Sequence, residues 1–75
     1  QTLLRGLGVV QAVASGARDL KENARIIGTT RSTTHSLVSC LVDERYQRVK
    51  PHVGYLLGPK LIEMGLQARE EVPQA

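Results

Sequence analysis

The sequence predicts a mainly helical domain that carries one small β-hairpin. Four segments have apolar residues at three- and four-residue steps, which is the spacing of one helix face. One segment, 46–57, changes to an extended pattern around a centre that contains proline and glycine, which is typical of a hairpin. With 75 residues in total, the chain has room for one domain over 1–75.

The composition excludes several ways of stabilising so small a domain. A chain of this length buries only about 60% of the surface that it exposes when unfolded. Cys40 is the single cysteine, which excludes an internal disulfide, and with His35 and His52 it forms no paired zinc-ligand spacing. We therefore expect no metal and no cofactor, and we expect oligomerisation or a further domain to supply stability.

The cysteine content and the apolar runs also bear on location. A single cysteine fits a reducing cytoplasm. No apolar run approaches the roughly 18 residues that a membrane span needs, and no signal-peptide pattern is present. We expect a cytoplasmic protein that has no contact with a membrane.

The formal net charge is +3, and it is unevenly distributed. Basic residues gather between positions 18 and 50, whereas Glu63, Glu70 and Glu71 lie near the end. This distribution is typical of a polyanion-binding surface beside a separate contact region. A solvated surface of mixed charge is the alternative.

The first two helices are predicted over 2–14 and from Asp19 to about Gly28. Asp19 and Glu22 form a capping box, in which Asp19 accepts from an amide three residues on and Glu22 reaches back. Glycine is favoured just past a helix end, so Gly28 closes the second helix. Asn23 lies beside the apolar face of this helix and is a mild misfit if it is buried.

A third helix is predicted over about 30–44, with Thr29 as its N-cap and Thr30 as the alternative. One face has apolar or small residues at i, i+3, i+4 and i+7 and is expected to be buried. The opposite face is polar and free of acids until Asp43, so it can approach phosphates and base edges without like-charge repulsion. This polar face consists of Arg31, Ser32, His35, Ser36 and Ser39.

After Arg45 the pattern becomes extended, which predicts a hairpin over 46–57. Pro59 suits the first turn of a final helix, predicted over 59–75. The second and third helices with their short turn form a helix-turn-helix, and the hairpin lies beside it as a wing. The sequence therefore predicts a winged helix-turn-helix: a three-helix core, a wing and a C-terminal linker helix.

The chain resembles the N-terminal domain of the IclR (isocitrate lyase regulator) family of transcriptional regulators over roughly 2–66. The order and spacing of four motifs carry the resemblance. They are Leu4-Arg5-Gly6-Leu7, Asp19-Leu20-Lys21-Glu22, Arg31-Ser32-Thr33-Thr34-His35 and Gly54-Tyr55-Leu56-Leu57-Gly58-Pro59-Lys60-Leu61.

This resemblance implies a bacterial regulator, usually a repressor and sometimes an activator, that binds double-stranded operator DNA as a homodimer or a tetramer. It also implies that the linker helix, 59–75, leads to a separate C-terminal domain, which binds a small-molecule effector and is absent from this chain.

Three positions depart from the family pattern. Ser36 stands where members often have a basic residue, so one DNA contact is expected to be weaker. Arg45 stands where glycine is usual, and a left-handed conformation there costs roughly 1 kcal/mol. Thr29-Thr30 replaces a more apolar, proline-containing start of the third helix. These differences affect the sequence and affinity of binding rather than the fold.

The predicted DNA contacts begin at the third helix. Such a helix fits the major groove, and its N-terminal residues meet the base edges. Arg31 is the first candidate for reading a guanine edge, with a phosphate clamp as the alternative. We expect groove contacts from the rest of the polar face, and phosphate contacts from the second helix and the wing. These further candidates are Ser32, Thr33, His35, Ser36, Ser39, Lys21, Arg25, Arg48 and Lys50.

The first and last helices carry more apolar surface than one small core needs. We predict that part of this surface forms a twofold contact between two chains. The predicted contact residues are Leu3, Leu7, Val10, Val13 and Leu66.

Two other function classes compete with DNA binding. Ser32, His35 and Cys40 make no catalytic set, because no acid is placed to orient the histidine and the chain is too short to form a closed pocket. We therefore expect no enzyme. A winged helix that serves only protein interaction or dimerisation is the serious alternative. Acids on the third helix would favour it, whereas this helix presents Arg31 and hydroxyls.

Overall fold

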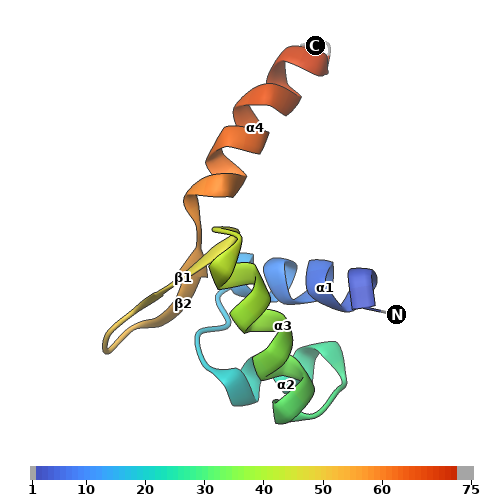
Figure 1. The fold of residues 1–75 in the computed structure, drawn as a ribbon, viewed down its shortest axis with the longest axis vertical. Helices are drawn as coiled ribbons and strands as arrows, with labels where there is room; N and C mark the ends of the chain where they lie inside the picture. The colour runs from blue at the N-terminus through green and yellow to red at the C-terminus, as the bar shows by residue number, and fades with distance from the viewer. Residues whose placement is uncertain (1, 73–75) are drawn as a thin grey trace.

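The computed structural model describes residues 2–72, which form four helices and a two-stranded antiparallel hairpin. The three-helix body is followed by the hairpin, which projects to one side, and by a last helix that leaves the body (Figure 1). The predicted fold class, mainly helical with one hairpin, is confirmed. The elements are α1 (Thr2–Ala14), α2 (Leu20–Ile27), α3 (Arg31–Asp43), β1 (Gln47–Lys50), β2 (Gly54–Leu57) and α4 (Pro59–Glu71).

The start of α2 follows the predicted capping chemistry with one difference. The Asp19 side chain accepts a hydrogen bond from the Glu22 amide at 2.7 Å. The Glu22 carboxylate accepts from the amide of Arg18 at 3.1 Å, one residue before the N-cap. Two backbone donors at the helix start are thus satisfied, which is what a capping box achieves.

The N-cap of α3 is Thr30, so our choice of Thr29 was wrong and the alternative holds. The Thr30 hydroxyl accepts from the amide of Thr33 at 3.1 Å. Thr29 belongs instead to the end of α2. Gly28 has a left-handed φ of 72°, and the amides of Gly28 and Thr29 both donate to the Ala24 carbonyl. Because this helix-ending motif uses Thr29, the next residue caps α3.

The core is small and partly polar. Its apolar residues are mostly valines and alanines of α1, α2 and α3, and Asn23, Thr34 and Gln47 are buried with them. The Asn23 amide nitrogen donates to the Asp19 carbonyl at 2.8 Å, but its side-chain oxygen has no partner among the described residues. The Gln47 side-chain oxygen likewise has none. The predicted misfit of Asn23 is therefore real, because an unpaired buried oxygen destabilises the fold.

Val13 lies in this core and not on the surface that we expected it to share with a second chain. Only 1% of it is exposed, whereas Leu3 and Leu7 on the same helix are exposed. The apolar face of α1 is wide because it has two parts. Val9 and Val13 pack inside the domain, whereas Leu3 and Leu7 stay on its surface.

Arg45 ends the turn after α3 in a left-handed conformation, with φ of 68°. This is the conformation that its place in the sequence implied. Its carbonyl accepts from the amide of Lys60 at 3.0 Å, and the Gly58 amide donates to the Tyr46 carbonyl at 2.8 Å. A side chain at Gly58 would overlap the Arg45 backbone, so glycine is required for this close approach.

Candidate nucleic-acid interface

The predicted recognition face is an exposed strip along α3. Arg31, Ser32, His35, Ser36 and Ser39 are all exposed, and the buried Thr34 and Val38 hold the opposite side of the helix against the core. Positions 31, 35 and 39 are one turn apart, so their side chains lie in a row. The face meets its first acid at Asp43, in the last turn. A polyanion can therefore approach most of the helix without repulsion.

The hydroxyls of this face are already part of the local structure. The Thr33 hydroxyl accepts from the hydroxyl of Thr30 at 3.1 Å, and Thr33 is half-buried. The Ser36 hydroxyl donates to the Ser32 carbonyl at 3.3 Å. Ser32 is exposed at the helix N-terminus, where unpaired amides favour an anion. Thr33 thus takes part in capping, and Ser32 is the freer of the two for a phosphate.

The two basic residues of the wing lie on the face that is turned away from α3. Val49 pairs with Tyr55 across the hairpin, and both line a hollow of about 220 Å³ against α3. Since side chains alternate along a strand, Arg48 and Lys50 point to the opposite face. Both are exposed. The structure therefore does not bring them beside Arg31; any contact that they make with DNA is separate from that of the recognition face.

Lys21 and Arg25 are exposed on α2, one turn apart. Arg25 lies in the last turn of that helix, close in the chain to the turn that leads into α3. This placement puts both cations on the helix that precedes the recognition helix, where winged helix-turn-helix domains meet the DNA backbone.

Arg18 is the residue whose role the sequence did not indicate, since it was counted only among the basic residues of the middle segment. One guanidinium nitrogen lies within hydrogen-bond distance of three carbonyl oxygens: those of Val13 at 3.0 Å, Ala17 at 3.1 Å and Tyr55 at 3.1 Å. Its carbonyl accepts from the Tyr55 amide at 2.9 Å. The only local signal is Gly54, whose missing side chain leaves room for the Arg18 backbone.

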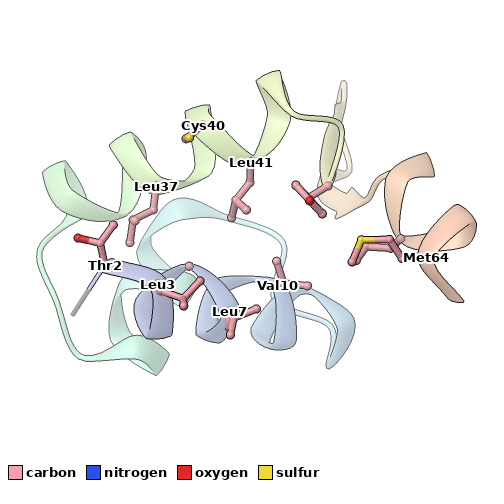
Figure 2. Close-up of a pocket in the computed structure, with 11 residues that line it drawn as sticks. Thr2, Leu3, Leu7, Val10, Leu37, Cys40, Leu41 and Met64 are labelled. Carbon is pink, nitrogen blue, oxygen red and sulfur yellow. The ribbon is translucent and has the colours of Figure 1, made fainter. Parts of the chain in front are cut away.

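An apolar hollow of about 370 Å³ lies between α1, α3 and α4. Figure 2 shows Leu37 and Leu41 projecting from α3 toward α1, with Met64 of α4 at one end. Of the residues predicted for a twofold contact, Leu3, Leu7 and Val10 line this hollow. Leu66 is exposed on α4 but does not line it.

The model of the IclR helix-turn-helix domain matches residues 2–50 of the chain. The chain belongs to this family. The match covers the three-helix body and β1, and so includes the recognition face. The chain is therefore a DNA-binding domain of the kind found in transcription regulators, and not an enzyme.

Two solved structures have the same fold as this IclR-type domain. HmgR of Pseudomonas aeruginosa superposes with a TM-score of 0.82 at 20% identity, over 95% of this chain and 30% of that one. A protein of Rhodococcus sp. RHA1, provisionally assigned as a transcriptional regulator, superposes with a TM-score of 0.78 at 27% identity, over 97% of this chain and 30% of its own. The domain thus spans about 30% of the length of each of these chains. No curated protein matches it in sequence.

Two further findings concern the part of the chain that the structure describes. No helix there is long and apolar enough to cross a membrane. Residues 2–72 also contain no group of three or more His, Cys, Asp or Glu side chains that could hold a metal ion.

Proposed function

We propose that this IclR-type domain binds an operator duplex with α3 in the major groove. The exposed, nearly acid-free face of α3, which begins with Arg31, carries this proposal. Arg31 lies in the first turn, where a recognition helix meets base edges, and its guanidinium can donate two hydrogen bonds to a guanine. His35, Ser36 and Ser39 follow along the same face and contact the groove.

Phosphate contacts supplement this reading of bases. Ser32 and Thr33 lie at the positive end of α3, and the cations of α2, Lys21 and Arg25, reach the backbone beside the groove. Arg48 and Lys50 contact the phosphate backbone or the minor groove from the outward face of the wing. Because these contacts go to the backbone, they add affinity and little sequence information.

We also propose that two chains associate through the apolar surface of α1 and α4. Leu3, Leu7 and Val10 are the central residues, with Leu66 further along α4, and Val13 is left out because it is buried. Association into a homodimer, or a tetramer in the longer protein, lets two recognition helices meet two half-sites about one helical turn apart. In this proposal α4, with residues 73–75 that lie outside the described part, leads to an effector-binding domain of a bacterial repressor in the cytoplasm.

The competing function is a winged helix that binds only protein. The two proposals differ in what the face of α3 meets, and selection from random duplexes separates them. We expect selection of a bound sequence with twofold symmetry. For each tenfold rise in salt concentration, the logarithm of its affinity should fall by roughly 0.9 per phosphate neutralised. If no duplex is enriched, and binding does not depend on salt even when two chains are joined, the operator proposal is wrong and the interaction module takes its place.

A further inference from the structure

We infer that Arg18 is a positioning residue for DNA binding: it fixes the wing against the three-helix body, so that Arg48 and Lys50 are held where they meet the DNA backbone. The inference rests on the proposed wing contact. It assigns to Arg18 a role through the wing and no contact with DNA.

Two hydrogen bonds join Arg18 to the wing. The Arg18 carbonyl accepts from the Tyr55 amide at 2.9 Å, and the Arg18 guanidinium donates to the Tyr55 carbonyl at 3.1 Å. Both backbone groups of Tyr55 are therefore turned away from β1 and bonded to Arg18. Since the free edge of a strand presents unpaired amides and carbonyls, Arg18 closes this edge in place of a third strand.

Arg18 is itself bonded to the three-helix body. The same guanidinium nitrogen donates to the Val13 carbonyl at 3.0 Å, at the C-terminal end of α1, and to the Ala17 carbonyl at 3.1 Å. A cation at a helix C-terminus interacts favourably with the helix dipole and with the last carbonyls. One side chain thus joins β2 to the end of α1.

The hairpin is joined to the body at two places along its length. The base of the wing is held to α3 by the Tyr46 amide, which donates to the Leu41 carbonyl at 2.8 Å. The Arg18 joint lies at the other end of β2, beside Gly54. Lys50 pairs with Gly54 and Arg48 with Leu56, so the two cations lie on the part of the hairpin between or beside these supports. Without its guanidinium, Arg18 loses the side-chain bond to the Tyr55 carbonyl, and this joint keeps the backbone bond from the Tyr55 amide to the Arg18 carbonyl.

The test compares R18M with the double variant R48A/K50A, and with both together, in the 75-residue chain. Methionine keeps a long side chain and leaves the backbone bond to Tyr55, but removes every guanidinium bond. R5M is the matched control, because Arg5 is an exposed arginine on α1 and its loss changes the net charge equally. Affinity for a selected duplex is measured from about 50 to 200 mM salt, after correction for the folded fraction by circular dichroism.

Loss of two phosphate contacts reduces the slope of log affinity against log salt concentration by about 1.8. Between about 50 and 200 mM salt, the affinity of such a variant therefore falls about 12-fold less than that of the original chain. We expect R48A/K50A to show such a loss, R18M to show most of it, and R5M to show none. In the R48A/K50A background R18M has no further effect, because the contacts that it positions are already gone. A merely structural role would lower affinity by the same factor in both backgrounds.

The outcomes separate the two proposals. If R48A/K50A binds like the original chain, the wing contact itself is wrong. If R48A/K50A is impaired and R18M is not, or if R18M weakens binding equally in both backgrounds, the wing contact stands and the inference about Arg18 is wrong. Should R18M be mostly unfolded at the assay temperature, the same comparison is made at a lower temperature at which R18M is folded.

Discussion

The carbonyl oxygen of Arg45 accepts a hydrogen bond from the amide of Lys60 at 3.0 Å, so the turn that ends α3 also holds the first turn of α4. The two residues are distant in sequence because the whole wing lies between them. A pair between the Arg45 guanidinium and Glu63, at 3.7 Å, adds a second link to α4, although both side chains are more than half exposed. The orientation of α4 is thus set at the C-terminal end of α3.

Replacing Arg45 with glycine is expected to stabilise the domain. Arg45 has a left-handed φ of 68°, a conformation that costs a residue other than glycine about 1 kcal/mol. Glycine adopts it without that cost. The exposed pair with Glu63 contributes little. R45G should therefore raise the midpoint of thermal unfolding by about 4–8 °C, the shift that 1 kcal/mol gives in a domain of this size. E44G is the control: Glu44 has an ordinary φ of −91°, so glycine there lowers the midpoint. A fall in R45G would show that the ion pair outweighs the strain.

Replacing Gly54 with alanine is expected to destabilise the wing. Gly54 has a φ of 113°, and a side chain there would overlap the carbonyl oxygen of Arg18. Together the strain and the overlap should lower the free energy of unfolding by about 2–3 kcal/mol, measured by urea denaturation. G65A is the matched control, because Gly65 lies in α4 with nothing within 4 Å of the added carbon. Alanine at position 65 should raise the free energy of unfolding by about 0.5–1 kcal/mol. Equal effects of the two variants would contradict this explanation.

Replacing Asn23 with leucine, which has a similar shape, is expected to raise stability by about 1 kcal/mol. The side-chain oxygen of Asn23 is buried without a partner, and the Asp19 carbonyl that its nitrogen meets also accepts from the backbone amide of Asn23. T34V is the comparison, because the equally buried Thr34 hydroxyl donates to the Thr30 carbonyl at 2.8 Å. Valine at position 34 should lower the free energy of unfolding by about 1 kcal/mol. We expect the denaturant midpoint to rise in N23L and to fall in T34V. A destabilised N23L would mean that the side-chain oxygen of Asn23 has a partner in solution.

Replacing Arg31 with alanine is expected to weaken binding to the selected duplex by about 1–3 kcal/mol and to relax the choice of base at one position. Binding-site selection with the variant measures this change, with R5A as the charge-matched control. A uniform loss over all sequences, with a salt slope lower by about 0.9, would instead assign Arg31 to a phosphate.

Replacing Leu7 with glutamate is expected to abolish self-association, because Leu7 is 56% exposed on α1 and lines the apolar hollow. A charge cannot be buried there without a partner. Sedimentation velocity over a range of concentrations measures the effect. I26E is the control: Ile26 is 49% exposed on α2, away from this hollow. If L7E and the original chain sediment alike, the contact lies elsewhere.

The element order and the recognition face were predictable from sequence because they depend on local signals. Helix periodicity, the cap at Asp19, Gly28 and the proline at position 59 each act within a few residues. Thr29 and Thr30 are both good caps, and only the ending of α2 decides between them. Val13 and Leu7 belong to one apolar stripe, and only packing shows which of them faces the core. The bonds between Arg18 and Tyr55 span 37 residues, and apart from Gly54 no local pattern indicates them.

Within the described residues α4 has no buried side chain, and it leaves the body as a single projecting rod (Figure 1). Its 13 residues give it a length of about 20 Å. It is held near its start, by the bond from the Lys60 amide to the Arg45 carbonyl and by the Arg45–Glu63 pair, so it can tilt as one unit about the C-terminal end of α3. A tilt of α4 by about 10° about this point moves its far end by roughly 3 Å. Conversely, a displacement of that size at the far end of α4 acts on the turn at Arg45 and therefore on the C-terminal end of α3.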